Sequence, residues 1–126
     1  MPDPSLRVTL LPKDTGGLGN IFGGVILSYI DLAGAVEARK HGSRLFVTRA
    51  MKEVEFIAPV RVGDIVSFYT ETLKVGRTSV TVKVAVETQR GLGLDAKPVR
   101  VTEAVVTYVA VDPQGRPIPV KGQGSG

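Results

Sequence analysis

The sequence predicts an α+β protein in which one long helix is wrapped by an antiparallel sheet. Residues 23–40 repeat apolar side chains at steps of three and four, which is typical of a helix, whereas two-residue alternation dominates after residue 44. Apolar side chains occupy most of the helix circumference, so the helix should be largely buried and needs cover on several sides. A curved antiparallel sheet would supply that cover.

The first half of the chain contains a short strand, a loop and the helix. Residues 6–12 are typical of a strand, and residues 13–20 of a loop rich in glycine. The helix is expected from Gly23 to about Lys40. Its last turn is basic, which suits the helix dipole, and Gly42 follows as a C-cap.

Four long antiparallel strands are expected after the helix. The clearest one alternates Val80, Val82, Val84 and Val86 with polar side chains, which indicates a half-buried strand. The preceding segment is its hairpin partner, with the turn at Gly76. A single chain of this design leaves a sheet edge and part of the helix environment open, so two sheets should pair across a dimer. The expected strands are residues 45–60, 64–75, 77–90 and 98–112, with a type I turn at 112–115.

Composition narrows the possible functions. We expect a single domain over residues 1–120 and a flexible, glycine-rich tail over residues 121–126. Cysteine is absent, which excludes disulfides, thiolate ligands and a cysteine nucleophile. No apolar run approaches the roughly 20 residues that span a bilayer, and the N-terminus lacks a signal-peptide pattern, so a cytoplasmic location is expected. The net charge of +4 favours anionic partners, but no basic run indicates nucleic acid.

Residues 19–34 carry one carboxylate, Asp31, in an almost wholly apolar segment. Gly24, Ser28, Asp31 and Ala35 follow steps of four, three and four, so they form one stripe of small side chains. An unpaired carboxylate is costly to bury, which makes Asp31 a functional candidate. The residues alone leave two roles open for Asp31: a catalytic carboxylate, or one that hydrogen-bonds a neighbouring backbone and fixes the dimer.

The chain resembles the hot-dog-fold acyl-CoA thioesterases, especially the bacterial YciA-like group, over roughly residues 8–117. The resemblance rests on "PKDTGGLGNIFGGVILSYIDLAG", "VTRAMKEVEFIAPVRVGDIVSFYTE", "VGRTSV" and "VTEAVVTYVAVDPQGRP". It implies a homodimer assembled further to a tetramer or hexamer, with active sites at the dimer interface. It also implies hydrolysis of acyl-CoA to a fatty acid and free CoA, with no metal or prosthetic group, because CoA is part of the substrate.

Two positions of the family pattern carry over to this chain. By the resemblance, Asp31 matches the catalytic carboxylate and Asn20 a polar position just before Gly-Gly. The chain departs from the pattern at Gly16, where members often have Asn, and at Phe22, where eukaryotic relatives often have His. Bacterial relatives can also carry Asp at the position of Asn20.

Hydrolysis of a thioester needs an activated water, or a direct nucleophile, and a group that stabilises the oxyanion. Asp31 can act as general base, or as a nucleophile that forms an anhydride. The free N–H groups near Gly23 and Gly24 can stabilise the oxyanion, with help from the helix dipole. Asp31 lies about 12 Å beyond Gly23 along the helix, so a site made from two chains is expected. Asn20 either orients the water or carbonyl, or is a turn or N-cap residue.

Further candidates concern the substrate. Arg77, Thr78 and Ser79 could bind a CoA phosphate or a pantetheine amide, or form an ordinary hairpin turn. Arg49 and Arg100 could contact phosphates or pair with nearby glutamates. His41, the only histidine, is expected at a solvated helix end. The expected substrate-binding residues are Phe22, Gly23, Ser28, Phe56, Arg77, Thr78 and Ser79, with Leu27, Tyr29 or Phe56 closing the acyl tunnel.

Three alternatives to a thioesterase remain open from the sequence. A non-catalytic acyl-CoA-binding module would bind the same ligand without releasing thiol. A hot-dog hydratase or dehydratase would need a histidine beside a carboxylate, but His41 lies ten residues past Asp31 at the helix end. A purely structural dimer would show no affinity for CoA.

Overall fold

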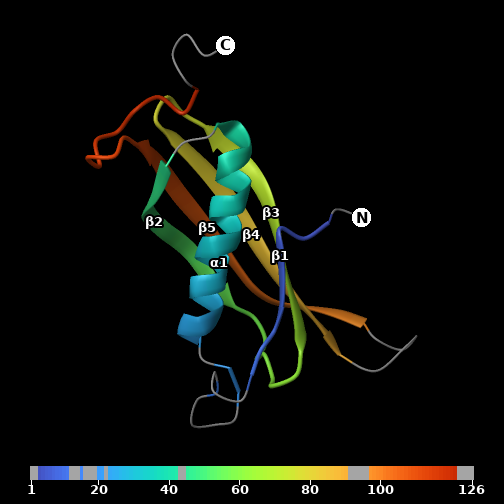
Figure 1. The fold of residues 1–126 in the computed structure, drawn as a ribbon. Helices are drawn as coiled ribbons and strands as arrows, with labels where there is room; N and C mark the ends of the chain where they lie inside the picture. Colours follow the sequence, from blue (N-terminus) through green and yellow to red (C-terminus); the bar gives the residue numbers. More distant parts are fainter. Residues whose placement is uncertain are drawn as a thin grey trace.

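The computed structural model describes residues 3–11, 15, 20–21, 23–42, 45–90 and 97–121. In this part of the chain, one helix packs against the concave face of a five-stranded antiparallel sheet with the strand order β1-β3-β4-β5-β2 (Figure 1). The α+β prediction is therefore confirmed. The elements are β1 (Leu6–Thr9), α1 (Gly23–Ala38), the 3-10 turn η2 (Arg39–His41), β2 (Leu45–Phe56), β3 (Ile65–Val75), β4 (Ser79–Arg90) and β5 (Lys97–Val111).

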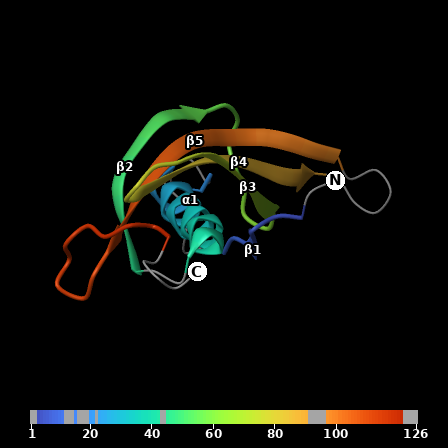
Figure 2. The same cartoon turned by 90° about the horizontal axis from the view of Figure 1, so that it is seen from above.

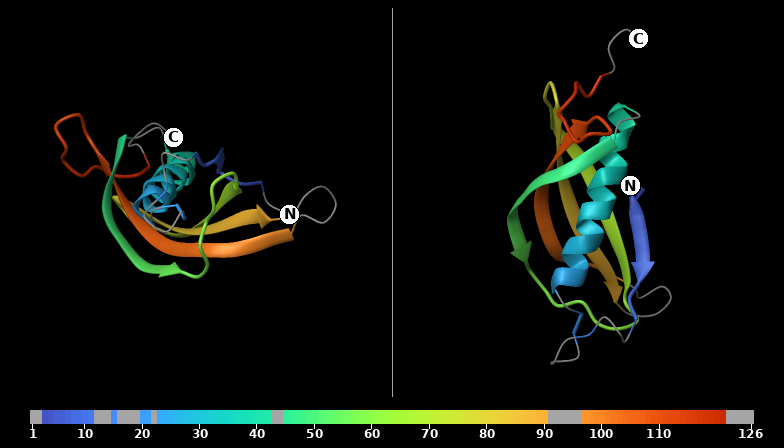
Figure 3. Two further views of the ribbon diagram at one scale, coloured as in Figure 1. Left: turned by 90° about the horizontal axis from the view of Figure 1, so that it is seen from below. Right: turned by 60° about the vertical axis from the view of Figure 1, so that its left-hand side comes forward.

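The sheet curls around α1. Figure 2 looks roughly along the helix and shows β4 and β5 arching over α1 while β2 curves around one side of it. Figure 3 shows β2 and β1 flanking the helix at the two edges of the sheet. The register of β2 against β5 shifts twice, and Glu53 at the second shift has a left-handed φ of 54°. Bulges of this kind increase local twist, so they help β2 to bend around the helix.

The core forms between the helix and the three inner strands, β3, β4 and β5. Val80, Val82, Val84 and Val86 of β4 are all fully buried, which confirms the alternation expected for this strand. Thr88 continues the same row and is also fully buried, but its hydroxyl has no hydrogen-bond partner among the described residues. On the helix, the side chains that face this row include Ile26, Ile30 and Ala33.

The opposite face of the helix is uncovered in a single chain. Leu32 and Val36 are 58% and 45% exposed, as expected for a single chain that leaves part of the helix environment open. The reason is that the sheet covers only one side of α1. The neighbouring edge strand β2 also exposes Leu45 and Val47. These residues of α1 and β2 form an apolar surface that no other described segment covers, and we name it the open edge.

The helix ends with the C-cap residue that the sequence predicts. Arg39–His41 form a separate 3-10 turn, and the Gly42 N–H donates to the Arg39 carbonyl at 3.3 Å. Gly42 is the C-cap of this turn, with an extended backbone of φ 165°. The loop expected at residues 13–20 and the tail at 121–126 lie mostly outside the described residues. No helix in the described part of the chain is long and apolar enough to cross a membrane.

Candidate active site

Asp31 lies on α1 beside the edge strand β2. The Thr48 hydroxyl of β2 donates a hydrogen bond to Asp31 Oδ1 at 2.6 Å. The carboxylate is partly exposed in the single chain rather than buried without a partner. A hydroxyl that donates to a charged oxygen makes a strong, directional contact, so Thr48 fixes the orientation of Asp31.

Tyr108 of β5 approaches the same residue from beneath the helix. Its hydroxyl donates to the Asp31 main-chain carbonyl at 2.6 Å, and only 1% of the residue is exposed. Thr48 and Tyr108 are paired residues of β2 and β5, which explains why both reach Asp31. Burial raises the pKa of the Tyr108 hydroxyl, and the negative charge of Asp31 raises it further. Tyr108 is therefore a protonated donor at any ordinary pH.

The small-residue stripe predicted on the helix is present and open. Gly24 and Ser28 are exposed, and a Cβ at Gly24 would meet no atom within 4 Å. The Ser28 hydroxyl bonds back to the Val25 carbonyl at 2.8 Å, so it projects little beyond the helix. A ligand can therefore approach this side of α1 closely.

A pocket of about 350 Å³ lies at the start of the helix. It brings together two predicted substrate-binding residues, Gly23 and Phe56, because the Phe56 ring packs 3.0 Å from where a Gly23 Cβ would stand. Asp31 does not line this pocket, as the distance along the helix requires. The pocket is lined by Ile21, Gly23, Ile26, Phe56, Ile57, Ala58, Pro59, Val60 and Thr102.

Asn20 lies beside this pocket on extended chain. It forms an antiparallel bridge with Arg61, and the next N–H, of Ile21, donates to the Val60 carbonyl at 2.9 Å. The N-cap alternative for Asn20 is therefore wrong, because Phe22 directly precedes the first helical residue. Phe22 itself lies outside the described residues.

The predicted phosphate-binding turn lies at the other end of the molecule. Arg77, Thr78 and Ser79 belong to the β3–β4 hairpin, near the C-terminal end of α1 (Figure 1). One chain therefore does not bring them to Gly23. Arg77 shares a pocket of about 300 Å³ with Lys121, so two cations line it.

The two strand arginines differ in their surroundings. Arg100 forms ion pairs with Glu103 and, at 3.2 Å, with Glu87, which confirms the paired alternative for this residue. Arg49 is exposed on β2.

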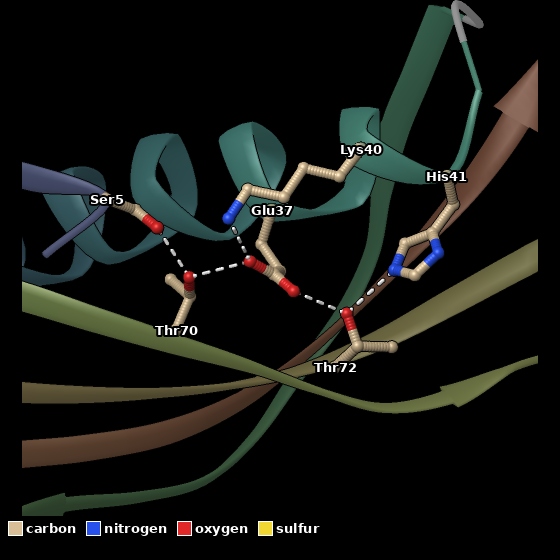
Figure 4. Close-up of polar contacts among 6 residues, drawn as sticks. All are labelled: Ser5, Glu37, Lys40, His41, Thr70 and Thr72. Carbon is tan, nitrogen blue, oxygen red and sulfur yellow. Dashed lines mark hydrogen bonds and ion pairs between the residues drawn. The ribbon is translucent and has the colours of Figure 1, made fainter. Parts of the chain in front are cut away.

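A second set of polar side chains joins α1, η2 and β3 near the end of the helix, with Ser5 just before β1, and we name it the Glu37 cluster (Figure 4). It consists of Ser5, Glu37, Lys40, His41, Thr70 and Thr72. The carboxylate of Glu37 accepts hydrogen bonds from Thr70 at 3.1 Å and Thr72 at 2.6 Å, and pairs with Lys40 at 3.0 Å. Burial alone would raise the pKa of Glu37, but the contacts with Thr72, Lys40 and Thr70 outweigh it and lower the pKa. Every partner donates to one carboxylate, so the cluster has a structural role.

His41 belongs to the same cluster. Its Nε2 lies 2.8 Å from the Thr72 hydroxyl, whose single hydrogen is donated to Glu37. His41 must therefore carry a hydrogen on Nε2 and act as the donor. The expected solvated role is wrong, because the histidine folds back onto β3. Across the described residues, no group of three or more His, Cys, Asp or Glu could hold a metal ion.

Known proteins resemble this chain closely. The thioesterase superfamily model matches residues 18–94. The acyl-CoA thioester hydrolase YciA of Escherichia coli K12 is 36% identical over 119 residues, which are 91% of this chain and 88% of that protein. The chain belongs to the thioesterase superfamily.

Similar solved structures support the assignment of this chain to the thioesterase superfamily. A hexameric hotdog fold thioesterase of Campylobacter jejuni has a TM-score of 0.88 and 44% identity, covering 94% of this chain and 90% of that chain. A hexameric broad specificity acyl-coenzyme A thioesterase has a TM-score of 0.89 and 38% identity, covering 96% and 88%. The latter structure is of a variant in which an aspartate is replaced by alanine. The predicted hot-dog fold is confirmed.

Sequence reasoning missed four residues around the sites of this thioesterase. Thr48, Tyr108 and Lys121 give no local signal, because their contacts depend on how distant segments meet. Gly34 did carry a signal, since glycine inside a helix usually has a packing reason. A Cβ at Gly34 would stand 2.1 Å from the Tyr108 hydroxyl.

Proposed function

We propose that this thioesterase hydrolyses the thioester of short- to long-chain acyl-CoA to a fatty acid and free CoA. The observation that carries the proposal is a hydroxyl-held carboxylate, Asp31, beside an open stripe of small side chains. Relatives named as acyl-CoA thioester hydrolases support the substrate class.

In the proposed reaction Asp31 acts as general base. It takes a proton from a water molecule, and the water oxygen attacks the thioester carbonyl carbon. The carbonyl electrons move onto oxygen, where the N–H groups near Gly23 and Gly24 stabilise the charge. The C–S bond then breaks, and the CoA thiolate takes the proton held by Asp31. Direct attack by Asp31 would give an anhydride that water later cleaves.

The site is proposed to form between two chains. The open edge has the unpaired backbone and apolar side chains that a second copy would cover, and pairing of two β2 edges would join the sheets. Asp31 of one chain would then face Asn20 and the Gly23–Gly24 amides of the other. Assembly to a hexamer is proposed by analogy with the hexameric relatives.

The remaining contacts are proposed for the CoA moiety. Arg77 and Lys121 offer two cations to a phosphate, with Thr78 and Ser79 nearby. Phe56 would contact the acyl or pantetheine chain at the pocket beside Gly23. The reaction needs no metal or prosthetic group in this scheme. A cytoplasmic location is proposed, which suits a chain without cysteine.

Thiol release tests the proposed function. Wild type and Asp31→Asn are compared on acyl-CoA esters from acetyl to palmitoyl with a colorimetric thiol reagent, to which the cysteine-free protein contributes no background. We expect wild type to release CoA and Asp31→Asn to be slower by about 10² or more. Glu71→Gln, which removes an exposed charge on β3, is the matched control and should keep full activity.

Two outcomes would contradict the proposal. No thiol release by wild type from any ester, together with measurable CoA affinity in calorimetry, would favour the non-catalytic binding module. Full activity of Asp31→Asn would remove the carboxylate from the mechanism.

A further inference from the structure

We propose that Tyr108 is a positioning residue: its hydroxyl holds the turn of α1 that carries Asp31 and so sets where the carboxylate meets the substrate. The inference rests on the proposed function, because Tyr108 acts only through Asp31. Neither the ring nor the hydroxyl of Tyr108 needs to touch the substrate, since the residue is buried between the helix and the sheet.

Asp31 is held at two points by one pair of neighbouring residues. The Tyr108 hydroxyl contacts the main-chain carbonyl at 2.6 Å, and the Thr48 hydroxyl contacts Oδ1 at 2.6 Å. Because Thr48 and Tyr108 are paired across β2 and β5, both donors move with the same part of the sheet. The main chain and the side chain of Asp31 are therefore both held by the same part of the sheet.

The helix does not need the hydrogen bond from the Tyr108 hydroxyl to the Asp31 carbonyl. A carbonyl in the middle of an α-helix already accepts the N–H four residues later, here that of Ala35. The Tyr108 hydroxyl uses the second lone pair of a carbonyl that is already satisfied. Its removal should therefore leave the helix intact and change mainly the position of the turn around Asp31.

The absence of a side chain at Gly34 leaves room for the contact between Tyr108 and Asp31. A Cβ there would stand 2.1 Å from the Tyr108 hydroxyl oxygen and 2.9 Å from two ring carbons. Glycine in a helix interior is unfavourable relative to alanine. Its presence one turn beyond Asp31 lets the hydroxyl pass between the helix and the sheet to reach the carbonyl.

The test is the rate of Tyr108→Phe, which removes one oxygen and keeps the ring. We expect kcat to fall at least about tenfold while KM changes less than about twofold, because small misplacements of a reacting group cost rate rather than binding. Tyr69→Phe is the matched control, since Tyr69 lies on β3 next to Phe68 in the chain and points to the other face of the sheet. It should retain the wild-type kcat.

A second comparison separates positioning from general loss of structure. In the Asp31→Asn background, Tyr108→Phe should change the residual rate less than about twofold, because the group it positions is absent. An equal loss in both backgrounds would overturn the proposal, and so would a folded Tyr108→Phe with wild-type kcat. If Tyr108→Phe does not fold, Gly34→Ala, which displaces the hydroxyl, takes its place, and wild-type kcat in that folded variant would also overturn it.

The outcomes distinguish this inference from the proposed function. A wild type that releases no thiol overturns the proposed function. A wild type that releases thiol, with a Tyr108→Phe variant equally fast, overturns only the role of Tyr108.

Discussion

Replacing Gly34 with alanine should destabilise the fold even though alanine is the better helix former. The helix gains about 1 kcal/mol from the substitution. Against this, the new Cβ would lie 2.1 Å from the Tyr108 hydroxyl and must separate from it by about 1.3 Å to reach the 3.4 Å limit of ordinary contact. Overpacking of this kind costs about 1–3 kcal/mol, and a buried hydroxyl left without its acceptor costs about 1–3 kcal/mol more. The expected net loss in the free energy of unfolding is about 1–5 kcal/mol.

Urea unfolding followed by circular dichroism measures this loss. Gly24→Ala is the matched control, because a Cβ at Gly24 meets no atom within 4 Å, and it should be neutral or stabilising by up to about 1 kcal/mol. Adding Tyr108→Phe to Gly34→Ala removes the closest contact and should recover at least about 1 kcal/mol. A Gly34→Ala variant as stable as wild type would refute the reasoning.

Three further substitutions test single contacts. Thr48→Val should lower kcat about tenfold or more while Thr48→Ser retains activity, since a hydrogen bond to a charged group such as Asp31 is worth about 1.5–3 kcal/mol. Equal kcat values for the two variants in steady-state assays would contradict this. Glu37→Gln should lower the free energy of unfolding at pH 7. The variant should also lose less of its stability than wild type as the pH falls from about 5 to 3. The reason is that the pKa of Glu37 is lowered below 4.5, so its charge stabilises the fold at neutral pH and this contribution disappears in acid. Urea midpoints against pH measure this, and an unchanged acid slope would count against it. Thr88→Val should raise the free energy of unfolding by about 1 kcal/mol in the same urea assay, because it removes a buried hydroxyl without a partner among the described residues; a loss would reveal a partner.

The order and type of the elements could be predicted because each has a strong local period. The helix start at Gly23 and the alternating valines of β4 appear in the structure where the sequence puts them. The turn at Gly76 also separates β3 from β4 as expected. These features depend on residues a few positions apart, which a sequence displays directly.

The contacts of Asp31 could not be predicted, because they depend on register. Thr48 reaches the carboxylate only because β2 pairs with β5 in one alignment, and that alignment shifts at bulges directly after Thr48 and again near Glu53. A bulge has no reliable sequence signal, and one residue of slip would turn Thr48 to the other face.

The contact of His41 at the end of the helix was mispredicted for a related reason. His41 was expected in solvent, but it finds an acceptor on β3, Thr72, 31 residues later. Leu32 and Val36 lie on the part of the helix that one chain was expected to leave open, and no described segment of the chain covers them. Local composition specifies that a residue needs a partner, and does not specify which segment or which chain supplies it.

Complementation between two inactive variants tests the central claim most directly. Asp31→Asn lacks the base, and Gly24→Val blocks the helix amides with a side chain whose Cβ would have no described atom within 4 Å apart from its chain neighbours and the adjoining helix backbone. Each alone should be inactive. When the two are unfolded together and refolded at equal concentration, a site built from two chains receives both intact groups in about a quarter of cases by random pairing. We therefore expect about a quarter of the wild-type rate of thiol release. A mixture as inactive as its components would contradict an active site assembled from two chains.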